Sequence, residues 1–259
     1  MHLNLAAYRF TDLDDLPALR QRLLEAGRRL GVCGTVLLSP EGVNLVVSAP
    51  ADAARRFAGV LTGSPALAGL VFKESRSDAP SFKRFLVKIK REIITFRQPG
   101  CQPQQRPGPR VDPVTLGRWL DRGHDDDGRP VALVDTRNRF EVEVGRFASA
   151  IDPGIASFSA LPEALSKQRD SLAGKRIVAY CTGGIRCEKA VLWMTANGFD
   201  TAVQLDGGVL GYFEAIGGRH WDGELFVFDR RVSLTPALRP GSWTQEVGSR
   251  RIRPAAEAL

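Results

Sequence analysis

Residues 176–190 read Arg-Ile-Val-Ala-Tyr-Cys-Thr-Gly-Gly-Ile-Arg-Cys-Glu-Lys-Ala, and this stretch decides the fold. The apolar run 177–180 contains β-branched residues and lies between polar residues, which predicts a buried strand. Residues 186–196 have helical spacing, and the Asn-Gly pair that follows them is typical of a helix end. Cys181 therefore lies where a strand ends, a glycine-rich loop turns and a helix begins.

This loop predicts an activated cysteine. Gly183 and Gly184 let backbone N–H groups approach one atom closely, and the first helical turn adds further unpaired N–H groups. A thiolate near the positive end of a helix dipole is stabilised, so we expect the pKa of Cys181 to lie below the free value of about 8.5. The alternative is a structural cysteine buried at a strand end, although Thr-Gly-Gly is a poor sequence for a core.

The length of the loop separates two kinds of anion site. Cysteine phosphatases have an arginine as the sixth residue after the cysteine, because phosphate needs a wide ring of amides. Here the fifth residue is an arginine and the sixth is a cysteine, so the ring is tighter and suits a sulfur anion. We predict Cys181 as the catalytic nucleophile and the following active-site loop: Thr182, Gly183, Gly184, Ile185, Arg186 and Cys187.

At these residues the sequence resembles the rhodanese family. Matching blocks are Val-Asp-Thr-Arg-Asn at 134–138, the cysteine loop, and Leu-Asp-Gly-Gly at 205–208, in the order and spacing of that family. Single residues between the blocks also match, namely Glu141, Gly145 and Phe147. The resemblance covers roughly residues 112–221 and implies an α/β rhodanese domain with a parallel sheet.

Asp135 and Arg137 follow the predicted strand 131–134. In an open parallel sheet the active crevice lies at the carboxyl ends of the strands, so both should lie on the same side of the sheet as Cys181. The resemblance likewise implies that they flank the active-site loop. Two supporting roles are open: shaping the loop through a salt bridge, which we favour for Asp135, or binding an anionic substrate.

A longer match points to a subfamily. Residues 180–190 resemble the rhodanese-like tRNA uridine hydroxylases, which make 5-hydroxyuridine at the wobble position with molecular oxygen, and residues 34–44 and 224–232 resemble them too. The resemblance implies a tRNA anticodon loop as partner and oxygen as co-substrate, with no other cofactor evident. Several members have a cysteine-rich C-terminal extension, which this sequence lacks.

Three functions are open at this point. In tRNA hydroxylation, the Cys181 thiolate adds to C6 of uracil, which raises the electron density at C5, where oxygen can react. In sulfur transfer, Cys181 carries a persulfide, and Cys187 either resolves it as a disulfide or packs as a small core residue. In a noncatalytic binding module, Cys181 would react with iodoacetamide no faster than glutathione does.

The composition narrows the setting. With 43% hydrophobic and 25% charged residues, the chain resembles an ordinary soluble globular protein. Its four cysteines lack the spacing of a disulfide framework or a zinc site, so we predict no metal. No signal-like or membrane-spanning run occurs, so we expect the cytoplasm and no membrane partner. The formal charge of +7 suits a polyanionic partner without establishing one.

The N-terminal part, 1–98, predicts an α+β domain of ferredoxin-like type, in the order β-α-β-β-α-β. The resemblance implies the same architecture, an acylphosphatase-like domain. Its predicted strands include a short one at 70–73 and a longer one at 85–96. On the longer strand, one face holds Phe85, Val87 and Ile89, and the opposite face holds three candidate RNA-binding cations: Arg84, Lys88 and Lys90. A solvated polar face is the commoner alternative.

The remaining boundaries follow from composition. Residues 99–112 are rich in proline, glutamine, arginine and glycine, which predicts a linker with Cys101 exposed. The rhodanese domain is predicted at 113–222, with one helix at 161–172. A frayed C-terminal tail is predicted at 223–259. The sequence does not indicate an oligomeric state.

Overall fold

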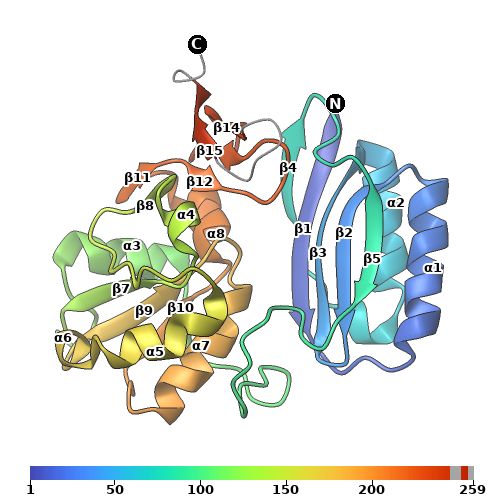
Figure 1. Cartoon of the computed structure of the whole chain (residues 1–259). Helices are drawn as coiled ribbons and strands as arrows, with labels where there is room; N and C mark the ends of the chain where they lie inside the picture. The colour runs from blue at the N-terminus through green and yellow to red at the C-terminus, as the bar shows by residue number, and fades with distance from the viewer. Residues whose placement is uncertain (246–251, 256–259) are drawn as a thin grey trace. The chain divides into compact units, whose positions relative to one another are not determined.

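The computed structural model describes residues 1–245 and 252–255. The chain divides into two compact units, Met1–Thr95 and Phe96–Leu259, which Figure 1 colours from blue to red. The segment predicted as a linker, 99–112, belongs to the second unit. The predicted tail, 223–259, lies partly outside the described residues, at 246–251 and 256–259.

The first unit is a five-stranded sheet with two helices against one face (Figure 1). Its strands run in the order β4-β1-β3-β2-β5, and β5 pairs parallel to β2 at the edge. The elements are β1 (His2–Phe10), α1 (Leu16–Arg29), β2 (Cys33–Ser39), β3 (Gly42–Pro50), α2 (Ala51–Thr62), the 3₁₀ turn η1 (Pro65–Leu67), β4 (Lys73–Ser77) and β5 (Phe85–Ile89). The predicted β-α-β-β-α-β order is present, with β5 added after it.

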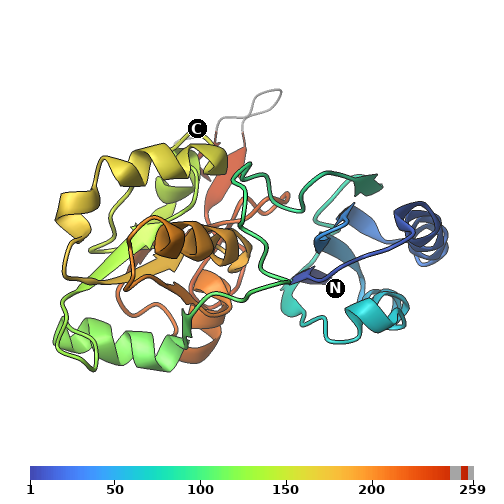
Figure 2. The ribbon, with the colours of Figure 1, turned by 90° about the horizontal axis from the view of Figure 1, so that it is seen from below.

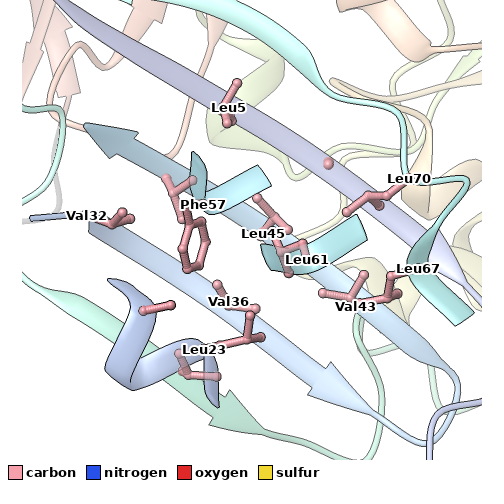
Figure 3. Packing of buried hydrophobic residues seen from close by; sticks show 14 of the residues in the cluster. Leu5, Leu23, Val32, Val36, Val43, Leu45, Phe57, Leu61, Leu67 and Leu70 are labelled. Atoms are coloured by element: carbon pink, nitrogen blue, oxygen red, sulfur yellow. The ribbon is translucent and has the colours of Figure 1, made fainter. Parts of the chain in front are cut away.

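The core of this unit lies between the sheet and its helices (Figure 3). Val43 and Leu45 alternate along β3 and point to the helices, because successive strand residues point to opposite faces. Phe57 and Leu61 meet them from α2, one helical turn apart, and Leu23 adds to the layer from α1. Strand and helix periodicities thus place their apolar residues in one layer.

The two predicted strands after α2 need correction. The strand predicted at 70–73 begins only at Lys73, and the strand predicted at 85–96 ends at Ile89. Phe85, Val87 and Ile89 were predicted on one face, but Ile89 is 42% exposed at the end of the edge strand β5, in which only Val87 is buried. Phe96 belongs to the second unit and stacks there on Phe158, with ring centroids 4.5 Å apart.

The second unit is a four-stranded parallel sheet, ordered β6-β10-β9-β7, with helices on both faces (Figure 2). Helices α3 and α8 pack on one face and α5 and α7 on the other. The strands are β6 (Arg110–Val111), β7 (Val131–Asp135), β9 (Arg176–Tyr180) and β10 (Val203–Leu205). The helices are α3 (Pro113–Arg122), α4 (Arg139–Val142), η2 (Phe158–Ala160), α5 (Leu161–Ser166), α6 (Arg169–Leu172), α7 (Ile185–Ala196) and α8 (Gly208–Ile216). The predicted parallel α/β architecture is confirmed.

Three antiparallel strand pairs complete this unit: β8 (Gly145–Phe147) with β11 (Trp221–Gly223), β12 (Leu225–Phe226) with β13 (Ser233–Leu234), and β14 (Trp243–Gln245) with β15 (Ile252–Pro254). Short segments of the predicted tail, from β12 to β15, are therefore paired rather than frayed. Among the described residues, every helix is too short or too polar to cross a lipid bilayer.

Two further predictions in this unit are wrong. Cys101 was expected to be exposed but is only 5% exposed. Val111, in the same proline-rich stretch, pairs with Leu205 as part of β6, so an apolar residue there completes the sheet edge. The helix predicted at 161–172 is broken into α5 and α6, which bury different leucines against the core.

Candidate active site

Cys181 lies at the carboxyl end of β9, in the loop that leads into α7, as predicted. The residue before the helix, Gly184, has a φ of 101°, a conformation that favours glycine. The loop is also held from α8: the N–H of Val209 donates to the carbonyl of Cys181 at 3.0 Å, and that of Leu210 donates to Thr182 at 3.0 Å. The start of α8 thus fixes the backbone of Cys181 and of the residue that follows it.

Cys181 is 1% exposed, and its sulfur accepts a hydrogen bond from the N–H of Gly184 at 3.2 Å. Burial raises the pKa of this thiol, but the Cys187 thiol, the Arg186 charge and the N–H groups of Arg186 and Gly184 together outweigh it and lower the pKa to about 6. The cradle therefore favours the thiolate, the form that acts as a nucleophile.

Arg186 does not point into an open anion site. Its guanidinium forms a bidentate ion pair with Glu141, with both N···O distances at 2.8 Å, and Glu141 is fully buried. Glu141 also accepts the N–H of Asn138 at 3.1 Å, which fixes the carboxylate at the start of α4. The positive charge beside Cys181 is thus held in place by a carboxylate from a distant part of the sequence.

Asp135 and Arg137 form a second buried ion pair at the end of β7, 2.6 Å between Nη2 and the carboxylate. Both residues have no exposed surface, and Arg137 also donates to the carbonyls of Glu141 and Gly145 at 3.3 and 2.7 Å. Its guanidinium lies 5.1 Å from the ring centroid of Trp221. This geometry favours the structural role for both residues over the binding of an anionic substrate.

Cys187 is fully buried in the first turn of α7, behind Cys181. The hydroxyl of Thr136 lies 3.5 Å from its sulfur. Burial and the neighbouring Cys181 sulfur raise the pKa of Cys187 well above its ordinary value. The pair therefore holds one thiolate, on Cys181, and one thiol.

The other loop residues complete the placement. Thr182, Gly183 and Ile185 are half-buried on the loop. The side-chain oxygen of Thr182 is buried and has no hydrogen-bond partner among the described residues. No group of three or more His, Cys, Asp or Glu side chains suited to a metal occurs within 1–245 and 252–255.

The candidate RNA-binding residues Arg84, Lys88 and Lys90 are exposed: Arg84 directly precedes β5, Lys88 lies in it and Lys90 directly follows it. They belong to the first unit, whereas Cys181 belongs to the second. Lys88 pairs in register with Leu37, on the sheet edge. Their exposure leaves them available to a polyanion, and their role stays a prediction.

Three residues of the site received no role from the sequence. Glu141 is signalled by the pattern Asn-x-x-Glu at 138–141, which is typical of a helix start with a reciprocal cap. Gly208 has a φ of 61°, and a Cβ there would lie 2.5 Å from the carbonyl oxygen of Cys181, so only glycine fits against the loop. Thr136, which touches Cys187, carries no local signal that predicts this contact.

Comparison with protein-family models matches both units. Residues 2–93 match the UPF0176 acylphosphatase like domain, and residues 117–215 match the rhodanese-like domain. The predicted acylphosphatase-like and rhodanese folds are thereby confirmed. The first match ends close to the division between the two compact units, which follows Thr95.

Relatives named tRNA uridine(34) hydroxylase match nearly the whole chain. That of Burkholderia vietnamiensis (strain G4) is 49% identical over 242 residues, 92% of this chain and 85% of the relative. That of Variovorax paradoxus (strain S110) is 51% identical over 236 residues, 91% of this chain and 90% of the relative. That of Paraburkholderia phytofirmans (strain PsJN) is 46% identical over 256 residues, 97% of this chain and 89% of the relative.

Proposed function

This chain belongs to the tRNA uridine(34) hydroxylase family, and we propose that it converts the wobble uridine of tRNA to 5-hydroxyuridine with Cys181 as nucleophile. The observation that carries this assignment of Cys181 is its cradle: a buried sulfur that accepts the Gly184 N–H at 3.2 Å beside the Arg186–Glu141 ion pair. The family membership supports the reaction, and the cradle supports the residue.

The chemistry begins with addition of the Cys181 thiolate to C6 of uracil, which is electrophilic because it is conjugated to the C4 carbonyl. The addition forms a C6–S bond and moves an electron pair toward C5 and O4, giving an enolate. Molecular oxygen then reacts at C5, the position that becomes hydroxylated. Oxygen as co-substrate is a proposal from the family resemblance, and we propose no other cofactor.

The first step needs a thiolate near neutral pH. With a pKa of about 6, most Cys181 is ionised at pH 7, so no histidine base is required to remove its proton. The Arg186 charge and the amides that stabilise the thiolate also remain in place when the sulfur leaves C6. The cradle therefore supports both addition and release.

The substrate end of the proposal is the tRNA anticodon loop, where the wobble base is unpaired and can be turned outward into a protein site. Arg84, Lys88 and Lys90 are exposed cations that can contact the phosphate backbone. We further propose a cytoplasmic location, because thiols stay reduced there and Cys33, Cys101, Cys181 and Cys187 are not joined in disulfides.

Nucleoside analysis of tRNA tests the proposal. Cells without the gene should lack 5-hydroxyuridine and its derivatives, and the unaltered gene should restore them. We expect Cys181→Ala to restore less than about a thousandth of the product, because the nucleophile is gone. The matched control is Cys33→Ser, in β2 of the first unit, which should restore the full amount. Full restoration by Cys181→Ala would contradict the proposal.

Sulfur transfer is the second candidate, because the same amides can hold a persulfide on Cys181. The rhodanese-like domain supports sulfur transfer through its fold alone, and no relative reported above is named for that activity. Incubation with thiosulfate followed by mass spectrometry of the intact protein separates the two functions. A persulfide on Cys181 that passes to an acceptor thiol, together with an unchanged nucleoside profile in deleted cells, would favour sulfur transfer.

A further inference from the structure

We propose that Cys187 is a second redox-active residue of this site, which forms a disulfide with Cys181 in each cycle and thereby supplies, with it, the electrons for oxygen reduction. This inference rests on the proposed hydroxylation. It assigns a reaction to a buried thiol for which the first steps of that chemistry have no use.

The stoichiometry of hydroxylation calls for such a pair. Uridine and molecular oxygen yield 5-hydroxyuridine with one oxygen atom, and the other oxygen atom leaves as water. That balance requires two electrons and two protons besides the uridine. Oxidation of two thiols to one disulfide releases that number of each, so uridine, oxygen and two thiols give 5-hydroxyuridine, water and a disulfide.

The geometry places a thiol where this reaction needs it. Cys187 has no exposed surface and lies in the first turn of α7, directly after the loop. Its N–H donates to the Gly184 carbonyl at 3.0 Å, and the Gly184 N–H donates to the Cys181 sulfur at 3.2 Å. The Thr136 hydroxyl, 3.5 Å from the Cys187 sulfur, is itself tied to the Tyr180 carbonyl at 2.9 Å. Thr136 therefore holds the Cys187 sulfur at the end of β9, the strand that Cys181 directly follows.

The protonation states of the pair also suit this role. Burial and the nearby Cys181 sulfur keep the pKa of Cys187 well above its ordinary value, so it stays a thiol while Cys181 ionises. A protonated Cys187 does not compete for uracil, and it carries the proton that the departing oxygen needs. The other two cysteines, Cys33 and Cys101, are 148 and 80 residues away from Cys181 in sequence.

The two sulfurs can reduce oxygen in a series of balanced steps. The C5 enolate takes up oxygen and a proton as a hydroperoxide, and loss of the C5 hydrogen then breaks the C6–S bond and frees the Cys181 thiolate. The thiolate attacks the outer oxygen, the O–O bond breaks, and its electron pair stays on the C5 oxygen, which is protonated. Cys181 is now a sulfenic acid. The Cys187 sulfur attacks it, the S–S bond forms, and hydroxide leaves with the thiol proton as water.

A small-molecule thiol must then reduce the disulfide before the next cycle. Without such a thiol, the full chain should therefore make one product and stop. This behaviour separates the proposal from a reaction in which Cys187 is only a small residue of the core.

A single-turnover experiment tests the inference with the reduced full-length chain, freed of external thiol under nitrogen and mixed with unmodified tRNA. On admission of oxygen, we expect one Cys181–Cys187 disulfide per 5-hydroxyuridine, measured by peptide and nucleoside mass spectrometry. Cys187→Ser should make one product and then hold Cys181 as a sulfenic acid that dimedone labels. Cys33→Ser should behave as the unaltered chain.

The outcomes are distinguishable. Product without a disulfide in the unaltered chain overturns the inference and leaves the proposed function intact. The inference is also overturned, and the proposed function again left intact, if Cys187→Ser turns over repeatedly in the absence of external thiol and its Cys181 is not labelled by dimedone. Absence of any product from the unaltered chain overturns the proposed function and the inference with it.

Discussion

The first unit buries polar side chains that carry no charge, whereas the second unit buries charged ones. Within Met1–Thr95, all of which the structure describes, the buried polar residues are Asn4, Ser39, Ser48, Ser77 and Ser81. In the described part of the second unit they include Asp125, Asp135, Arg137, Glu141, Arg186 and Lys189. The exposed cations proposed for RNA lie in the first unit and the nucleophile lies in the second.

This difference indicates which unit does chemistry. Burying a charge is costly unless it is paired and hydrogen-bonded, so a fold selected for stability alone has little reason to do it. Around Cys181 the charges are paired, and they hold a backbone loop and a cation in fixed positions. The buried ion pairs of the second unit thus cost stability and pre-organise the site of the Cys181 thiolate. The core of the first unit is apolar and buries no charge.

The largest effect should come from breaking the Glu141–Arg186 pair. Glu141→Gln leaves the Arg186 charge buried without its carboxylate, which typically costs about 3–5 kcal/mol of unfolding free energy. Denaturant unfolding of the full chain should show this loss. The matched control is Glu143→Gln, whose exposed pair with Arg139 should change stability little. If Glu141→Gln and the control are equally stable, the buried ion pair does not matter for the second unit in the way described above.

The next effect tests the contact between α8 and the loop. Gly208→Ala would place a Cβ 2.5 Å from the Cys181 carbonyl oxygen and 2.7 Å from the Gly184 nitrogen, so the cradle must shift. A shift of about 1 Å at a catalytic group can cost roughly 100-fold in rate. Gly174→Ala is the control, because Gly174 has a similar φ of 71° but no atom within 4 Å of its Cβ position. If both variants lose the same amount of rate, backbone strain at a positive φ explains the effect and the contact between α8 and the loop does not.

The ionisation of Cys181 should show in its pH dependence. Because the thiolate is the reactive form and the pKa is about 6, the iodoacetamide rate should rise with pH and level off above pH 7. At pH 7 the thiolate fraction should be roughly 30 times that of a free cysteine with a pKa of about 8.5. Peptide mass spectrometry at Cys181 measures this rate. If the midpoint of this pH dependence lies near 8.5, the buried charges do not stabilise the Cys181 thiolate.

The smallest effect is expected from the first unit. Lys88→Glu with Lys90→Glu should weaken tRNA binding roughly 10-fold at low salt, with a flatter salt dependence, because two phosphate contacts are lost. The control makes the same charge change on the exposed face of α2, with Arg55→Glu and Arg56→Glu. If both pairs weaken binding equally, net charge rather than the β5 face attracts tRNA.

The sequence predicts the position of Cys181 in the fold well because the signals around it are local. An apolar run, two glycines and a helical pattern lie within 176–196, so Cys181 is placed without knowledge of the rest of the chain. Asp135 and Arg137 are placed nearly as well, since parallel strands end at one edge of the sheet. These predictions depend on secondary structure and strand direction alone.

Contacts between distant residues were not predictable in this way. The partner of Arg186 is 45 residues away in sequence, and its orientation depends on how α4 packs. Cys101 was expected in solvent because a proline-rich stretch lacks periodicity, yet tertiary packing buries it. The short strand β5 ends at Ile89 because it lies at a sheet edge, which the apolar pattern does not reveal.

Labelled oxygen can show whether the Cys181 thiolate directs oxygen to uridine 34. The purified chain, unmodified tRNA and a thiol reductant are incubated under ¹⁸O₂, and the digested nucleosides are analysed by mass spectrometry. We expect 5-hydroxyuridine at position 34 with one ¹⁸O atom, and none of it with Cys181→Ala. Product that carries oxygen from water, or equal product with Cys181→Ala, would contradict this expectation.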